Sequence, residues 1–148
     1  MLQKLIATNK DGIPLILRLA LGAVIFPHGA QKVLGWFGGG GFKATLEGMT
    51  GMGLPAAIVV MVMTAEFLGS LGLIFGFLTR LSALGIISVM LGAILTVHWR
   101  YGFFMNWTGK QAGEGFEFHL LAIGIAIALL IRGGGAFSID RALKNAQQ

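Results

Sequence analysis

Four stretches of the chain are made almost wholly of apolar residues and are long enough to cross a lipid bilayer as helices. They cover about residues 13–34, 54–78, 81–99 and 116–132. A spanning helix needs roughly 17 to 25 such residues, because each residue adds about 1.5 Å and the hydrocarbon core is about 30 Å thick. The pattern therefore predicts an all-α membrane protein, a four-transmembrane-helix bundle that forms a single domain over residues 1–148.

The connections between these predicted spans differ in length and character. Thr79 and Arg80 are almost all that separates the second span from the third, whereas residues 35–53 form a long glycine-rich connection. Within that connection Phe42, Leu46 and Met49 recur at the spacing of a helix. We expect a short interfacial helix in this first outer loop.

The composition changes the picture little and supports a membrane protein. Hydrophobic residues make up 55% of the chain and charged residues 11%, and the mean hydropathy is +0.81, which leaves too little polar surface for an ordinary soluble domain. We therefore expect a multi-pass protein of the cell inner (plasma) membrane, in contact with the lipid bilayer.

The distribution of charged residues indicates membrane topology and not nucleic-acid binding. Lys and Arg outnumber Asp and Glu by 11 to 6, but they are dispersed over the helix ends and form no basic stripe, so no nucleic acid is expected as a partner. If both termini lie on the side of the Arg80 turn, that side carries more basic residues than the other. The distribution therefore predicts N-in and C-in.

Charged and titratable residues inside the apolar runs are the candidate site. A charge near the bilayer centre costs roughly 2.5 to 3.5 kcal/mol, so Arg18, Glu66 and Glu117 should face the bundle interior and mark a working site. Counting about 1.5 Å per residue from the inner ends places Glu66 and Glu117 in one layer with His28 and His119, and Arg18 below it. Glu66, Glu117, His28 and Arg18 are thus the candidate catalytic residues.

Helical phase decides which of the last span's polar residues faces inward. Glu117 and His119 are two residues apart, about 200° around a helix, so both cannot enter one site. Glu117 shares a face with the small residues Gly124 and Ala128, which predicts that Glu117 faces inward. His119 could still reach a neighbouring helix or a loop.

Further candidates lie at the outer mouth of the predicted bundle. Lys32 and His98 fall above the layer of carboxylates, and Trp36 falls near the outer boundary together with the other residues of an expected aromatic belt, Trp99, Tyr101 and Trp107. Lys32, His98, His119 and Trp36 are the candidate residues for binding a cofactor or the head group of a ligand.

These residues could also have purely structural roles. Arg18 and Glu66 could simply staple the bundle, and the three histidines could be satisfied interior residues. Three His and two Glu could supply metal ligands, but no H-x-x-x-H spacing supports a metal site. The chain has no cysteine, which excludes thiolate nucleophiles and Cys-ligated iron–sulfur clusters, and it carries no evident flavin or haem motif.

Several motifs follow one another in a fixed order over nearly the whole chain. They are R-L-x-L-G and H-G-x-Q-K-x-x-G-W-F-G (Arg18–Gly22 and His28–Gly38), G-F-L-T-R (Gly76–Arg80), Y-G-F-F-M-N (Tyr101–Asn106) after His98, and G-G-G-A-F-S-I-D (Gly133–Asp140). Together they resemble the DoxX family of four-helix membrane proteins.

The resemblance implies a redox role. Relatives are associated with quinone-linked sulfur oxidation, as the membrane partner in a thiosulfate:quinone oxidoreductase, and with membrane complexes that handle oxidative or thiol stress. The fold is also similar to that of the vitamin K epoxide reductase group, whose chemistry uses cysteine pairs. That mechanism cannot apply to this chain, since it has no cysteine.

The leading hypothesis is a membrane subunit of a quinone-linked redox complex that binds a quinone-like head group. His28, Glu66 and Glu117 would hydrogen-bond the head group and deliver protons, and Arg18 would hold a carboxylate ionised or stabilise negative charge. Electrons would come from a partner redox subunit, so the chain need not be an enzyme alone. The alternatives are a small transporter or permeation protein working as a homo-oligomer, and a structural assembly factor.

Overall fold

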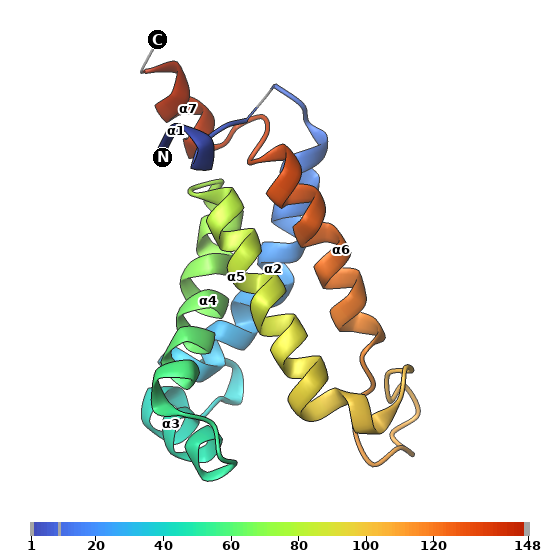
Figure 1. The fold of residues 1–148 in the computed structure, drawn as a ribbon. Helices are drawn as coiled ribbons and strands as arrows, with labels where there is room; N and C mark the ends of the chain where they lie inside the picture. The colour runs from blue at the N-terminus through green and yellow to red at the C-terminus, as the bar shows by residue number, and fades with distance from the viewer. Residues whose placement is uncertain (1, 9, 147–148) are drawn as a thin grey trace.

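The computed structural model describes residues 2–8 and 10–146, and every regular element in that part of the chain is helical. Both ends of the described chain lie at one end of the bundle, beside the short helices α1 (Leu2–Leu5) and α7 (Ile139–Asn145) (Figure 1). We call this the terminal end. The opposite end, with α3 (Gly41–Gly51) and residues 100–116, is the loop end.

The first long helix, α2, covers Ile13–Leu34, the same bounds as the first predicted span. Pro14 lies in its first turn, where the backbone N–H that proline lacks would have no helical partner. The helix ends at Gly35, whose φ of +74° is a left-handed conformation that glycine adopts without steric cost. Beyond it come the single turn η1 (Trp36–Gly38) and then α3.

A tight turn joins α4 (Ala56–Phe75) to α5 (Thr79–Ala93). The N–H of Phe77 donates to the carbonyl of Gly72 at 2.8 Å, and the N–H of Gly76 donates to the carbonyl of Leu73 at 3.2 Å. This pair of bonds, with Gly76 at a φ of +65°, is the Schellman arrangement that closes a helix at its C-terminus.

The third long helix does not stop where α5 ends. It continues through the π-helical turn η2 (Ile94–His98) and the 3-10 turn η3 (Trp99–Tyr101). A π-helical turn is wider than a regular one and is found frequently at functional sites. Here it carries His98 at the end of the third predicted span.

Three of the described helical stretches are long and apolar enough to cross a membrane, namely Ile13–Leu34, Ala56–Phe75 and Thr79–Tyr101. They coincide with the first three predicted spans. The fourth predicted span is α6 (Glu117–Arg132), which has 16 residues and a length of about 24 Å. Since that is shorter than the hydrocarbon core, the crossing of the bilayer by α6 stays a prediction. The short helix predicted in the first outer loop is present as α3.

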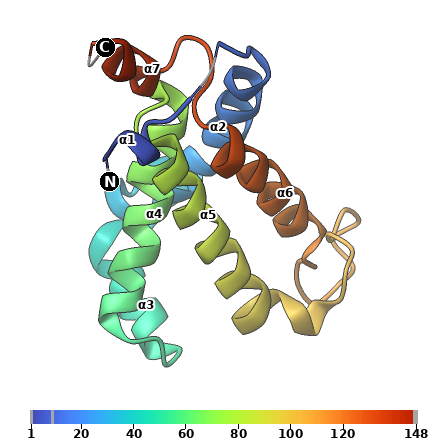
Figure 2. The same ribbon diagram turned by 45° about the horizontal axis from the view of Figure 1, so that its top comes forward.

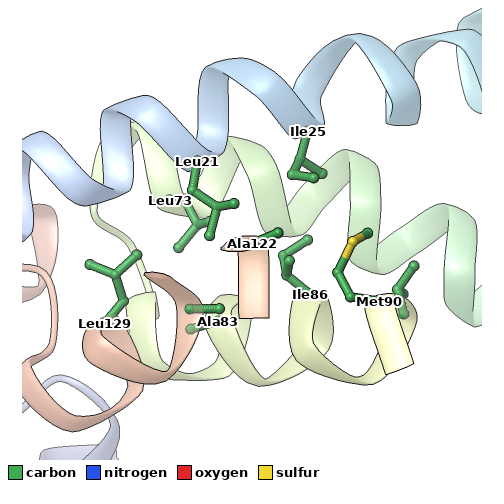
Figure 3. Packing of buried hydrophobic residues seen from close by; sticks show 10 residues of the cluster. Leu21, Ile25, Leu73, Ala83, Ile86, Met90, Ala122 and Leu129 are labelled. Carbon is green, nitrogen blue, oxygen red and sulfur yellow. The ribbon is translucent and has the colours of Figure 1, made fainter. Parts of the chain in front are cut away.

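The core of the bundle lies where α2, α4, α5 and α6 meet. Figure 3 shows the buried side chains of this cluster pointing toward one another from the four helices. Ile25, Ile86, Leu73 and Leu129 are all at most 1% exposed. Between membrane helices such contacts act through close van der Waals packing, because lipid tails are as apolar as the side chains.

Glycines set how closely α2 and α4 approach. A Cβ atom at Gly29 would come within 2.6 Å of the backbone of Phe67, and one at Gly22 would come within 2.8 Å of Ile74. Any larger residue would push the two helices apart. The two helices therefore pack directly against each other at these glycines, whereas a Cβ atom at Gly92 or Gly124 would have nothing within 4 Å.

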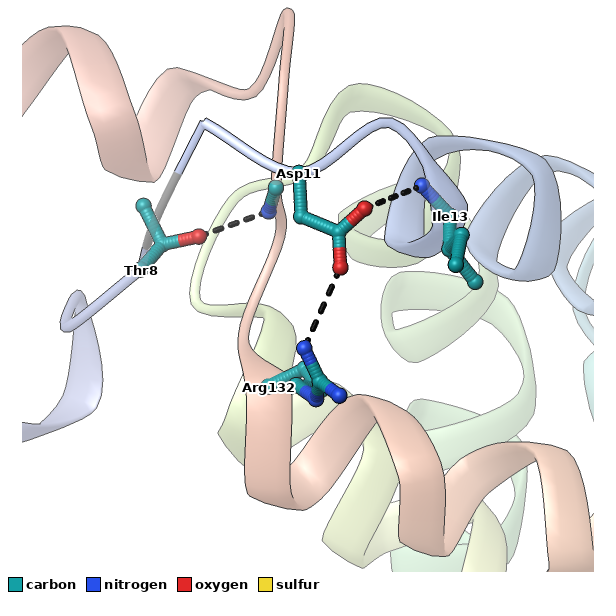
Figure 4. Close-up of polar contacts among 5 residues, drawn as sticks. Thr8, Asp11, Ile13 and Arg132 are labelled. Atoms are coloured by element: carbon teal, nitrogen blue, oxygen red, sulfur yellow. Dashed lines mark hydrogen bonds and ion pairs between the residues drawn. The ribbon is translucent and has the colours of Figure 1, made fainter.

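The first and last segments of the chain close the terminal end. The hydroxyl of Thr8 accepts a hydrogen bond from the N–H of Gly135 at 2.6 Å, and Asp11 lies 3.2 Å from Nη1 of Arg132. Figure 4 shows that the same carboxylate also accepts from the N–H of Ile13 at the start of α2. One acidic residue thus ties the beginning of α2 to the end of α6.

The helices are not parallel throughout. Figures 1 and 2 both show α4 and α5 close together at the terminal end and well separated at the loop end. Beyond the separation, α3 lies beside α4 on one side, and residues 102–116 lie beyond α5 and α6 on the other. This divergence positions the candidate site.

Candidate functional site

A long groove follows the divergence of α4 and α5 and has a volume of about 1460 Å³. Its wall is mainly apolar along its length. The lining groups that can carry charge gather toward the loop end, where the groove is lined by His28, Lys32, Glu66, His98, Glu114 and His119. The structure thus brings together five of the eight candidate residues of the sequence analysis: His28, Lys32, Glu66, His98 and His119.

Glu66 and Lys32 form an ion pair across the contact between α4 and α2. The Nζ atom of Lys32 lies 2.5 Å from Oε2 of Glu66, and the side chains are 26% and 7% exposed respectively. The close approach at Gly29 places the two helices at the right separation. The ion-pair partner of Glu66 is thus Lys32 and not Arg18.

His98 and His119 form the second polar pair. Their ring centroids are 4.1 Å apart and their planes are tilted by 43°. Nδ1 of His98 is 2.8 Å from the carbonyl oxygen of Glu114 in the outer loop. His119 is 7% exposed, and its Nδ1 atom has no hydrogen-bond partner among the described residues. A buried polar atom without a partner costs free energy, so this imidazole is a group available to a ligand.

Glu117 faces away from the groove, which contradicts the predicted facing of the last helix. Its Oε1 atom accepts hydrogen bonds from the backbone N–H of Met105 at 2.8 Å and from the indole N–H of Trp107 at 3.1 Å. The buried face of α6 is the one with His119, Ala122, Ala126 and Leu129. The alanines, not the exposed Gly124, mark the packed face.

Arg18 lies at the terminal end, apart from the other candidates, and its side chain is 2% exposed. The guanidinium donates to the carbonyl oxygens of Leu73 and Ile74 at the end of α4 and to three more in the segment after α6, those of Gly134, Ala136 and Phe137. The last carbonyls of a helix lack partners within the helix. Arg18 donates hydrogen bonds to these carbonyls and adds a positive charge at the negative end of the helix dipole.

Two further candidates lie at the edge of the site or outside it. His28 is exposed and lines the groove from α2. Trp36 is 55% exposed and is absent from the groove lining, with its ring 6.4 Å from that of Phe37. The structure therefore does not bring Trp36 to the other candidates.

Sequence reasoning missed Asp140 and the methionines. Asp140 is 1% exposed, and its carboxylate accepts from the N–H groups of Leu78 and Thr79 at the start of α5. The conspicuous G-G-G-A-F-S-I-D motif that ends in Asp140 was the available signal. Five of the seven methionines also line the groove, Met49, Met52, Met61, Met90 and Met105. Their positions in separate segments gave no pattern.

The described residues contain no group of three or more His, Cys, Asp or Glu side chains placed to hold a metal ion. The polar side chains of the groove instead form two pairs, Lys32 with Glu66 and His98 with His119, with His28 and Glu114 also in the lining. Hydrogen bonding and proton exchange with a polar ligand are what these two pairs can do.

Comparison with known proteins identifies the family. The sequence profile described as DoxX matches residues 13–99, more than half of the chain. This chain belongs to the DoxX family. The matched region of this DoxX protein holds four of the six titratable groove residues, His28, Lys32, Glu66 and His98, whereas His119 and Asp140 lie beyond it.

Two curated relatives extend the likeness. "Inner membrane protein YqjF" of Escherichia coli (strain K12) is 35% identical over 109 residues, 74% of this DoxX chain and 79% of the relative. "Putative oxidoreductase CatD" of Bacillus subtilis (strain 168) is 29% identical over 115 residues, 78% of this chain and 76% of the relative. No solved structure matches this DoxX protein.

Proposed function

We propose that this DoxX protein is the membrane subunit of a quinone-linked redox complex and that the loop end of the groove binds a quinone-like head group. The observation that carries the proposal is His119, a residue of the groove lining whose Nδ1 atom is buried and lacks a partner among the described residues. A relative with the word oxidoreductase in its name supports the redox class.

The side chains around His119 suit a ring with carbonyl groups. A quinone oxygen accepts hydrogen bonds, and an imidazole N–H or the ammonium of Lys32 donates them. Lys32 is held by Glu66 yet remains 26% exposed, so part of its ammonium faces the groove. A bound quinone would supply the two-electron acceptor, while His119 and Lys32 would hold its oxygens.

Proton delivery falls to the same two pairs. Reduction of a quinone to a quinol takes up two electrons and two protons. His98 contacts the loop carbonyl of the exposed Glu114 on one side and the ring of His119 on the other. An imidazole can take a proton on one ring nitrogen and release it from the other, so either imidazole could give a proton taken from solvent to a quinone oxygen hydrogen-bonded to it.

The apolar length of the groove suits an isoprenoid tail. Its walls include the exposed side chains of Leu68 (57%) and Leu84 (48%), and Met61 and Met90 lie on opposite walls. Methionine is unbranched and polarisable, and it adapts to irregular apolar ligands. Because the walls include residues that face the lipid, a hydrophobic ligand would enter sideways from the bilayer.

The proposal includes a cellular setting and a partner. We place the protein in the inner membrane, with α6 as the fourth crossing and with both termini inside, and the name of the relative YqjF supports that membrane. Electrons come from a partner redox subunit, since quinone reduction needs a donor. A homo-oligomer in the membrane is the alternative to this partner complex.

Binding of a short-chain quinone to purified protein tests the proposal. We expect ubiquinone-1 to raise the melting temperature of the detergent-solubilised protein by ligand linkage. His119→Phe keeps a ring but removes its nitrogens, and the apparent affinity should fall about tenfold, as expected for one lost hydrogen bond. Trp36→Phe, outside the groove, should bind as the unchanged protein does. Equal binding by the His119 and unchanged proteins would rule out this site.

The two alternatives make different predictions in the same system. A transporter would carry protons or a small solute across proteoliposomes, and Glu66→Gln would abolish that flux while quinones had no effect on stability. A structural assembly factor would lose thermal stability in Glu66→Gln but keep the activity of its complex. Quinone-dependent stabilisation with no flux supports the redox subunit.

A further inference from the structure

A second pocket lies at the terminal end, shares no lining residue with the groove and has a volume of about 270 Å³. Four segments meet there: the stretch after α1, the start of α5, the end of α6, and α7. Its wall contains three basic side chains from three helices, Arg80, Arg132 and Lys144. For comparison, a water molecule takes up about 30 Å³ in the liquid, so the pocket can hold a group the size of a phosphodiester.

The charge of this pocket is strongly positive. The carboxylate of Asp11 lies 3.2 Å from Nη1 of Arg132. This one carboxylate therefore offsets part of the charge of the three basic side chains. Arg80 and Lys144 have no ion pair among the described residues and contact only backbone carbonyls: Arg80 those of Ala7 and Ile131, Lys144 that of Thr8. These contacts fix the two side chains in place without neutralising them.

Donors remain for a ligand. An arginine has five N–H donors and a lysine has three. Arg80 gives Nε to Ala7 and Nη2 to Ile131, Lys144 gives one hydrogen to Thr8, and Arg132 uses Nη1 on Asp11. The pocket therefore retains a convergent set of charged N–H groups on backbone-anchored side chains, which suits the acceptor oxygens of a phosphate.

The place of the pocket in the membrane points to a lipid. Arg80 lies in the first turn of α5 and Arg132 ends α6, so both lie at the boundary of the apolar helices. Ile131 in the pocket wall is 66% exposed, and Ile127, one turn further along α6, is 43% exposed. A basic pocket with an apolar strip leading into the bilayer has the arrangement of a lipid head-group site.

We infer that this pocket binds the phosphodiester of an anionic phospholipid, with the acyl chains along Ile131 and Ile127 of α6. This site is independent of the proposed quinone site, because it shares no residue with the groove. A free phosphate ion has the same charged oxygens but gains nothing from the apolar strip, so lipid and free ion can be told apart.

Melting temperature and native mass spectrometry of the whole purified protein provide the test. Adding phosphatidylglycerol in mixed micelles should raise the melting temperature and leave bound lipid in the mass spectrum. Phosphatidylcholine and inorganic phosphate at equal concentration should do neither. A shift of the same size with phosphatidylcholine, or with inorganic phosphate alone, would overturn the assignment to an anionic lipid.

Charge-removing variants locate the site. Lys144→Gln and Arg132→Gln should each weaken phosphatidylglycerol binding roughly fivefold, the effect expected for one basic residue at a membrane surface. Lys43→Gln removes an equally charged side chain from α3 at the loop end, where it is 88% exposed, and should bind as the unchanged protein does. Arg80→Lys keeps the positive charge, so it is the control for a loss of binding that is caused only by a loss of folding. Equal binding by Lys144→Gln, Arg132→Gln and Lys43→Gln would contradict the site.

Discussion

The Nζ atom of Lys32 and the Oε2 atom of Glu66 lie 2.5 Å apart between two helices that are in contact at Gly29. The Glu66 side chain is only 7% exposed, and burial of an isolated charge is very costly, so the Lys32 ammonium compensates the carboxylate. The pair therefore joins α2 and α4 and at the same time sets the charge at the loop end of the groove.

Removal of one partner should cost more than removal of both. Lys32→Met leaves the Glu66 carboxylate buried and uncompensated, and we expect it to lower the free energy of unfolding by about 3 kcal/mol. The double variant Lys32→Met/Glu66→Gln should lose clearly less than the sum of the two single losses. Chemical unfolding in detergent measures all four proteins of the cycle. Strictly additive losses would mean that the two side chains do not interact.

Arg18 should resist even a conservative change. Arg18→Lys keeps the positive charge, but an ammonium is a point donor and cannot serve the separated carbonyls of Leu73, Ile74 and Phe137 that the planar guanidinium reaches. We expect a loss of about 2 to 3 kcal/mol, the cost of leaving buried acceptors unpaired. The melting temperature of the variant measures this loss. Arg100→Lys, at the loop end over the ring of Tyr101, is the matched control and should melt near the unchanged protein.

Asp140 should control the start of α5. Its two oxygens accept from the N–H groups of Leu78 and Thr79, which no helical carbonyl can serve. Asp140→Ala should cost about 1 to 2 kcal/mol, as the loss of a helix cap does, and Asp140→Asn should cost less because one acceptor oxygen remains. Amide hydrogen exchange at Thr79 should be faster in Asp140→Ala. Unchanged exchange at this amide would contradict the capping role.

Glu117 should act on the outer loop and not on the groove. Glu117→Ala removes the acceptor of the Met105 and Trp107 N–H groups, so exchange of the Met105 amide should accelerate about tenfold, as for one lost hydrogen bond. Glu117→Gln keeps an acceptor oxygen and should change it little. Quinone binding should be nearly equal in both variants. A large loss of binding in Glu117→Gln would restore this residue to the candidate site.

The apolar pattern was sufficient to predict the helices but not all their contacts. The bounds of α2 follow from Pro14 and Gly35, which act locally, and so the sequence contains the information directly. The facing of α6 depends instead on which small residues meet a neighbour. Gly124 is open on one side while Ala122 and Ala126 are packed, and nothing local distinguishes them.

The site was predicted in outline for a similar reason. Depth along a helix is a simple count, and it placed His28, Glu66, Glu117 and His119 in one layer. His28, Glu66 and His119 line one groove, whereas the prediction that Glu117 and not His119 faces inward was wrong. Pairing depends on three-dimensional crossing. The count of depth placed Lys32 only somewhat above Glu66, but it could not reveal the contact between α2 and α4 that joins them, nor the carbonyls that Arg18 reaches.

The bonds of Arg18 also have a consequence for how the protein is made. Three of its acceptors lie 116 to 119 residues later in the chain, in the segment that follows α6. The guanidinium enters the membrane with α2. Because synthesis proceeds at about 5 to 20 residues per second, on the order of ten seconds pass before those carbonyls are made. During that interval the nascent chain holds a charge without its final partners. These bonds can form only when residues 134–137 have left the ribosome.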